Sequence, residues 1–231
     1  MAAITHAVRT FTTTAGTKTG TATPALNDLI VITVACSSTT DMAAITVSDN
    51  NAGGAGVYTF IARYWDATRD LWIAFYVRTA LIASATSTIF SAPIVGDTGG
   101  GLVVHRVSGM TRTGASAVRQ QSGLSGAAST TPTGTMPGAV LTANPVIGAV
   151  INASNPAAMT PRGTPVYTES GDAGYATPAT GIETMFINSG ETGTAIAWGG
   201  TSASAYSCMV VELDTSAVAT DTKVNVIVAG I

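Results

Sequence analysis

The sequence predicts an all-β protein, specifically a jelly-roll-like antiparallel β-sandwich built of two similar halves with a C-terminal extended arm. Short extended runs rich in Val, Ile and Thr recur along the chain, separated by Gly, Asn, Asp, Pro and Ser. No segment of about ten or more residues has the 3.6-residue period of a helix. Regularly spaced strands bounded by such turns are typical of an antiparallel sandwich or barrel.

Strands are predicted in both halves, on either side of a long polar segment. In the first half they lie near residues 6–13, 28–36, 44–48, 57–65, 71–79, 86–91 and 101–108. In the second half they lie near residues 145–152, 165–169, 182–188, 193–198 and 205–213. The segment between them, about 109–142, is rich in Thr, Ser, Gly and Ala. It is either a disordered linker or an extended crossover laid on the sandwich, because "SAVRQQSG" has some strand character.

The strand pattern of the first half recurs in the second. "NDLIVITVAC" corresponds to "NPVIGAVINA", and "GLVVHRVSGM" to "CMVVELD". We expect residues 1–214 to form one sandwich, with halves of about 1–108 and 143–214 that each supply strands to both sheets, as the two Greek keys of a jelly roll do. The weaker alternative is two tandem domains, each of about 100 residues with a thin core.

The last residues, 215–231, are predicted to form an arm. A polar connection leads to "KVNVIVAGI", in which Val224, Val226 and Val228 share one face of a half-buried strand. Such a strand can pair with an exposed sheet edge. We expect that edge to belong to a neighbouring molecule of an assembly rather than to the same chain.

The composition favours a subunit that hides surface in an assembly. Charged residues make up 10% of the chain and the mean hydropathy is +0.37, whereas ordinary soluble domains carry roughly 25% charged residues. A Thr-covered single β domain is the alternative.

The net charge of −3 without a Lys/Arg cluster argues against a nucleic-acid partner. No apolar run approaches a membrane span, and no secretory signal is recognised at the start, so synthesis in a cytoplasm is expected.

Side-chain parity makes three predictions about strand faces. Cys36 should point inward and Cys208 outward, which leaves two free thiols. Trp72 and Tyr76 share one face of "DLWIAFYV", and the opposite face is more apolar. We therefore expect both aromatics to lie outward, covered by another chain or by the middle segment. A glycan contact is the alternative. A protein contact is preferred because protein–protein interfaces are enriched in Trp and Tyr.

Enzyme chemistry is nearly absent from the sequence. There are two histidines, and no Gly-x-Ser-x-Gly elbow or metal-type His spacing accompanies them. A Cys36–His105 nucleophile pair is a remote alternative to a structural His105. The turn "SDNNAGG" could offer calcium oxygen ligands from Asp49 and Asn51, but the same letters form ordinary turns. We predict no catalytic residue, no cofactor and no metal, with calcium at this turn as the minor alternative.

The first half also resembles a known family. Its motifs are an Asn-Asp entry to a buried strand, a Ser-Asp turn leading to an aromatic, a strand of alternating aromatics, and an apolar strand ending in Val-Ser-Gly. Here these are Asn27, Asp28, Ser48, Asp49, Gly53, Tyr58, Trp72 to Tyr76 and Val107 to Gly109. This arrangement resembles the jelly-roll structural and decoration proteins of tailed-phage virions, and the second half echoes it without the Ser-Asp turn.

The resemblance implies a structural role in a virion, most simply as a capsid decoration or minor capsid subunit that binds other proteins. The expected partners are the major capsid protein or other virion subunits, together with further copies of this chain, a trimer being the order that the resemblance suggests. A carbohydrate-binding module of a virion fibre or cell-surface protein is the alternative function.

Overall fold

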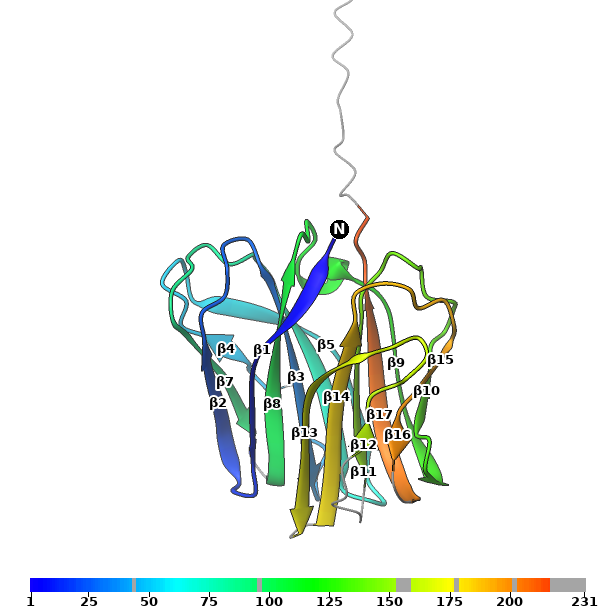
Figure 1. Ribbon diagram of the computed structural model, residues 1–231. Coiled ribbons are helices and arrows are strands. Elements are labelled where there is room, and N and C mark those ends of the chain that lie inside the picture. The colour runs from blue at the N-terminus through cyan, green and yellow to red at the C-terminus, as the bar shows by residue number, and fades with distance from the viewer. Residues whose placement is uncertain (43–44, 95–96, 153–158, 177–178, 201–202, 217–231) are drawn as a thin grey trace, which may run out of the picture.

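The chain folds almost entirely into antiparallel β-structure, which confirms the predicted fold class (Figure 1). The computed structural model describes residues 1–216, except 43–44, 95–96, 153–158, 177–178 and 201–202. One short 3₁₀ helix, η1 (Gly114–Ala117), lies between the two halves. Among the described residues, no helix is long and apolar enough to cross a membrane.

The strands fall into two halves, but the second half begins earlier than the predicted residue 143, because two of its strands come from the middle segment. The first half contains β1 (Ala3–Thr12), β2 (Gly16–Ala22), β3 (Leu29–Ser38), β4 (Ser48–Asp49), β5 (Gly56–Asp66), β6 (Leu71–Arg78), β7 (Thr88–Ile94) and β8 (Asp97–Ser108). The second half contains β9 (Val118–Ser129), β10 (Thr133–Thr135), β11 (Val146–Asn152), β12 (Met159–Thr160), β13 (Thr168–Ala176), β14 (Ala179–Ile187), β15 (Ala195–Ala197), β16 (Gly199–Gly200) and β17 (Ser204–Leu213).

The two halves have the same strand topology. The large sheet of the first half has the order β1-β8-β3-β6-β5, and that of the second half has the order β9-β17-β11-β14-β13. Each smaller sheet repeats as well, because β2–β7 and β4–β7 correspond to β10–β15 and β12–β16. Even the bulge between β5 and β6 recurs between β13 and β14. One difference is that β5 also pairs with β4 and so joins the two sheets of the first half.

Each half is therefore a jelly-roll-like sandwich in itself. Among the described strands, no sheet contains strands of both halves. The expectation that each half would supply strands to both sheets of a single sandwich does not match this topology. The repeated sequence pattern encodes a whole two-sheet unit, and the two units pack side by side with their large sheets facing each other (Figure 1).

Three apolar cores hold the molecule together. One lies between the two sheets of the first half and includes Trp72, Tyr76 and Phe90. Another lies inside the second half around Trp198 and Met185. The third core, here called the shared core, joins the two large sheets. It adds buried apolar area to two units that would each have only a thin core when alone. Its members include Val31, Ile73, Phe75, Val77, Ile147, Ile151, Met209 and Val211.

The shared core has an approximate two-fold arrangement. The central strands β3 and β11 lie opposite each other, while β5 packs on β9 and β1 packs near β13. Because β5 corresponds to β13 and β1 to β9, each edge contact is repeated with the roles of the halves exchanged. This reciprocity is the mark of an isologous interface, which here forms within one chain.

The middle segment forms ordered structure. It contributes η1, β9 and β10, so the extended alternative for residues 109–142 is confirmed and the disordered linker is wrong. The predicted arm lies almost wholly outside the described residues, which end at Ser216. Val224, Val226 and Val228 therefore remain sequence predictions.

Candidate functional site

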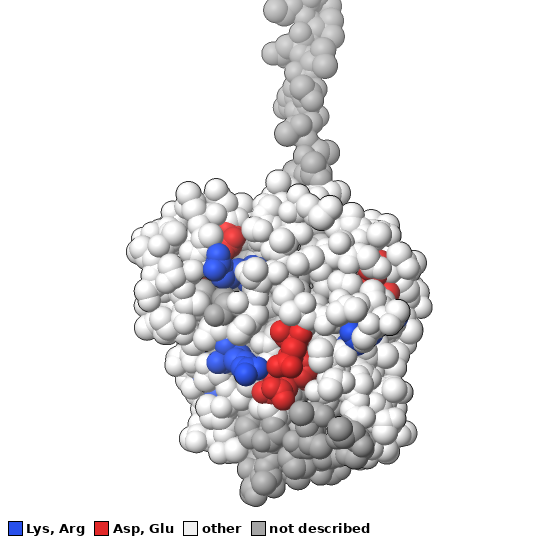
Figure 2. Space-filling model, in the orientation of Figure 1, with Lys and Arg blue, Asp and Glu red and all other residues white. Residues whose placement is uncertain are grey.

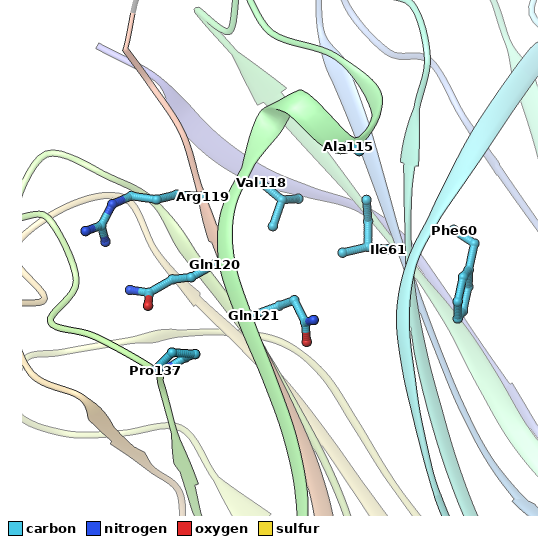
Figure 3. A pocket seen from close by; sticks show the side chains of 8 residues that line it. All are labelled: Phe60, Ile61, Ala115, Val118, Arg119, Gln120, Gln121 and Pro137. Atoms are coloured by element: carbon cyan, nitrogen blue, oxygen red, sulfur yellow. The ribbon is translucent and has the colours of Figure 1, made fainter.

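A groove opens at the seam between the two halves, where β5 of the first faces β9 of the second (Figure 3). Its volume is about 370 Å³. The walls combine apolar side chains with a short polar run of β9. They are Phe60, Ile61, Ala115, Val118, Arg119, Gln120, Gln121 and Pro137. The groove thus depends on strands that are about 60 residues apart in the sequence.

Two of the polar residues in the groove hold its wall in place. Arg119 Nη1 donates to Glu212 Oε2 at 2.6 Å and to the Ala139 carbonyl at 3.0 Å. The Gln120 amide exchanges two hydrogen bonds of 3.0 Å with the Gly138 backbone. These contacts fix the loop that carries Pro137 against β9. Gln121, by contrast, makes no side-chain hydrogen bond to another described residue.

The strand β9 lies at the edge of its five-stranded sheet. It pairs with β17 on one side. The Val118 N–H donates to the Ala115 carbonyl at the end of η1. On the other side of β9, no other hydrogen bond from the described part of the chain reaches its backbone. Successive side chains of a strand point to opposite faces, so a groove lined by Val118, Arg119, Gln120 and Gln121 together runs along this free edge.

A second pocket, of about 290 Å³, lies in the first half beside β4 and β5. Its walls include Tyr58, Phe60 and Tyr76. The Tyr76 hydroxyl accepts a hydrogen bond of 3.2 Å from the Ile45 backbone N–H. Burial raises the pKa of Tyr76 to about 12, so the hydroxyl stays protonated at neutral pH and can still donate a hydrogen bond.

The predicted outward placement of Trp72 and Tyr76 is wrong. They share a face as expected, but both are fully buried in the inner core of the first half. The small sheet covers that face, and Trp72 Nε1 donates to the Met42 carbonyl at 2.9 Å. The opposite face of β6 is buried too, in the shared core. Neither residue is therefore an interface residue of the folded chain, although the Tyr76 ring reaches the second pocket.

In the turn considered for calcium, the positive charge beside Asp49 is that of Arg78. Asp49 Oδ2 lies 2.9 Å from Arg78 Nε in a buried ion pair and also accepts from the Tyr58 hydroxyl. Asp49 Oδ1 accepts the backbone N–H groups of Asn51 and Gly56. The Asn51 amide nitrogen donates to the Ser84 carbonyl and the Thr88 hydroxyl, and its oxygen accepts the Gly53 backbone N–H. The calcium alternative is therefore not supported, because these oxygens already hold the turn together.

The cysteines and His105 do not form a reactive pair. Both thiols are free and buried, which confirms the predicted free state but corrects the outward placement of Cys208. Burial raises the pKa of Cys208 to about 12, and it also raises the pKa of Cys36 well above its ordinary value. Cys36 faces the inner core of the first half, whereas His105 lies on the opposite face of the sheet, toward the second half.

His105 links the two halves. Its Nε2 lies 2.7 Å from Ser170 Oγ, and its ring meets Phe186 edge-on at 6.2 Å. Burial lowers the pKa of His105 to about 3, so the imidazole is neutral at physiological pH. It therefore acts as a hydrogen-bonding contact between the halves, as the structural interpretation of this residue predicted.

Glu183 on β14 is a buried acid that the sequence did not single out. Neither carboxyl oxygen has a hydrogen-bond partner among the described residues. Burial, with the nearby charges of Glu169 and Asp172, raises its pKa to about 9. The described residues contain no group of three or more His, Cys, Asp or Glu side chains arranged to hold a metal ion.

The comparisons with known proteins identify no relative. A scan against protein-family models, a search of curated proteins and a search of solved structures each found no match. The assignment of a function therefore rests on the groove, the free edge of β9 and the distribution of charge.

Proposed function

We propose that this protein is a structural subunit of a phage virion, a capsid decoration or minor capsid protein that acts by binding other proteins. The resemblance of its strand and turn motifs to virion jelly-roll proteins suggests the setting. The observation that carries the proposal is the neutral character of its surface. Recognition on such a surface depends on shape, apolar contact and backbone hydrogen bonds.

The cationic side chains of the described residues are paired within the chain. All nine Lys and Arg residues of the described part lie in ion pairs with carboxylates. These are Arg9, Lys18, Arg63, Arg69, Arg78, Arg106, Arg112, Arg119 and Arg162. Figure 2 accordingly shows a mostly uncharged face, with charge gathered near the seam over β1 and β13. A nucleic-acid partner would instead require a basic patch without internal partners.

The test is recovery with particles. When virions of the encoding phage are purified on a density gradient, the chain should be present at a fixed copy number relative to the major capsid protein. Recombinant chain added to capsids that lack it should rebind to the same occupancy. Absence from purified particles, together with no rebinding, would contradict the proposal.

A carbohydrate-binding role is the second candidate. It is favoured by the pocket beside β4, where Tyr58 and Phe60 present aromatic surface and the Tyr76 hydroxyl can donate a hydrogen bond. Aromatic rings with a few placed polar groups are typical of small-ligand sites. Polysaccharide binding that is lost in Phe60→Ala, but kept in the distant Val166→Ala variant, would support this candidate.

A further inference from the structure

The central part of the free edge of β9, from Gln120 to Gly126, lacks the features with which natural sheets block further pairing. Its register with β17 is continuous from Gln120 to Gly126, with shifts only beyond those residues. No charged residue occurs from Gln120 to Ser129. Edge strands are normally guarded by charges, bulges or prolines, and an unguarded edge is a template for another strand.

The opposite edge of the same sheet is guarded. Its strand, β13, has a bulge between Glu169 and Gly171. Glu169 and Asp172 lie on that strand and pair with Arg9 of the first half at 3.3 and 3.7 Å. Paired charges therefore line this edge, whereas β9 carries no charge beyond Arg119. The contrast within one sheet indicates that β9 is left available for pairing.

The groove supplies room beside the edge. Phe60, Ile61 and Pro137 form apolar walls along the start of β9 (Figure 3). A strand added there would satisfy unpaired backbone groups of β9 and bury apolar side chains against these walls. Strand addition of this kind draws affinity from main-chain hydrogen bonds and specificity from alternate side chains.

The occupant is suggested by where the described chain ends. Arg112 Nε donates to the Ser216 carbonyl at 3.0 Å, and the Asp214 backbone N–H donates to Ala117 at 2.9 Å. The described chain thus ends near the start of β9. Beyond it, residues 217–231 include "KVNVIVAGI", whose nine residues would span about 30 Å as a strand.

We propose that residues 223–231 of a second copy of this chain add to the free edge of β9 as an antiparallel strand. Because β17 ends where β9 begins, the chain's own segment would have to turn back and run parallel to β9. Every other pairing in this sheet is antiparallel, and antiparallel pairing is slightly more stable. A second copy can approach from the direction that antiparallel pairing requires.

Cysteine cross-linking between two single variants tests the proposal on the purified full chain. The native Cys36 and Cys208 are buried, so introduced cysteines are the reactive ones. Mixing Gln121→Cys with Val226→Cys under mild oxidation should give a disulfide-linked pair containing one of each chain, at twice the 23.1 kDa mass. Val57→Cys, exposed on the first half, replaces Gln121→Cys in the control mixture and should give no such pair.

Sedimentation provides the second readout. The full chain should sediment as an oligomer at tens of micromolar, and a chain ending at residue 216 should sediment as a folded monomer. No cross-link in the mixture, combined with an intramolecular link in the double variant Gln121→Cys/Val226→Cys, would assign the edge to the chain's own segment and overturn the proposal. No link in either case would show that β9 is not the acceptor. Because no capsid is present, failure here is separate from failure of the virion role.

Discussion

Ionisable residues that are buried in this protein fall into two groups, paired and unpaired. Arg78 and Asp49 are fully paired inside the turn of the first half, and Lys18 and Asp97 form a similar buried pair at 2.8 Å. Glu183 and the Nδ1 atom of His105 have no partner among the described residues. The paired groups hold the structure, while the unpaired ones make its stability depend on pH.

Replacing Glu183 with Gln should stabilise the protein most at alkaline pH. The pKa of Glu183 is raised to about 9, so the folded state keeps a proton that the unfolded state releases above a pKa of about 4.3. Stability contributed by this group is therefore present at low pH and lost as pH rises toward 9. Glu183→Gln should raise the unfolding free energy by about 1–3 kcal/mol at pH 8.

Thermal unfolding of Glu183→Gln and the parent chain at pH 4 and pH 8 measures this difference. Asp41→Asn, which changes an exposed acid paired with Arg63, is the matched control and should show no gain at pH 8. An equal effect of Glu183→Gln at both pH values would contradict an ionisable origin.

Removing the Arg78 side chain, which pairs with Asp49, should lower the stability of the protein. Arg78→Ala leaves the buried Asp49 carboxylate without its partner, and such changes cost about 3–5 kcal/mol. Denaturant unfolding should show the loss, whereas Arg63→Ala, which removes a more exposed pair with Asp41, should cost about 1 kcal/mol or less. Calcium or a chelator should leave the melting temperature of the parent chain unchanged, and a rise with calcium would restore the metal hypothesis.

At the scale of single strands, the apolar strands were predictable and the polar ones were not. β3, β6, β8, β11 and β17 were predicted because their apolar runs are long. β2 was missed because "GTKTGTA" contains no large apolar residue, and its buried Lys18 depends on Asp97, a residue about 80 positions away. β9 was left open as linker or strand because its Gly and Ser residues favour neither.

The parity error at Trp72 has a physical cause. Assigning one outer face to "DLWIAFYV" assumed that one side of the strand meets solvent. Near-continuous apolar runs are instead typical of strands buried on both faces, and β6 is such a strand because two cores flank it. The groove could not be predicted, since it forms between Phe60 and Gln121, whose proximity depends on how the halves pack.

Gly148 is a strand position in the second half that only glycine fits. A Cβ at Gly148 of β11 would lie 2.7 Å from Trp198 Cζ2, so the indole ring occupies the space of a side chain. Gly148→Val should lower the unfolding free energy by about 1–3 kcal/mol through overpacking. Gly163→Ala, where a Cβ meets no atom within 4 Å, is the control and should be near neutral; an equal loss in both would contradict the packing argument.

For the whole molecule, the shared core should make the two halves unfold together. Phe75 lies in that core and Trp72 and Trp198 report on the inner cores of the first and second halves. Phe75→Ala should lower stability by about 3–5 kcal/mol while fluorescence from both halves still changes in one transition. Variants that keep Trp72 or Trp198 as the main reporter, with the other tryptophans changed to Phe, separate the two signals. Two separated midpoints in the parent chain would show that the halves are energetically independent.

Because the two matching units lie in one chain, their contact does not depend on protein concentration, as the contact between two separate subunits would. A dimer of identical units dissociates on dilution, and its stability depends on concentration, whereas the covalent link keeps this interface at a high effective concentration. In a symmetric pair, any substitution also appears on both sides at once. Here the sides have diverged. His105 of one unit meets Ser170 of the other. The contact between β1 and β13 is an ion pair of Arg9 with Glu169, whereas the matching contact between β9 and β5 is a hydrogen bond of Tyr64 with Ser125. A single gene product can thus present two different edges to its surroundings, which gives an assembly built from it a direction.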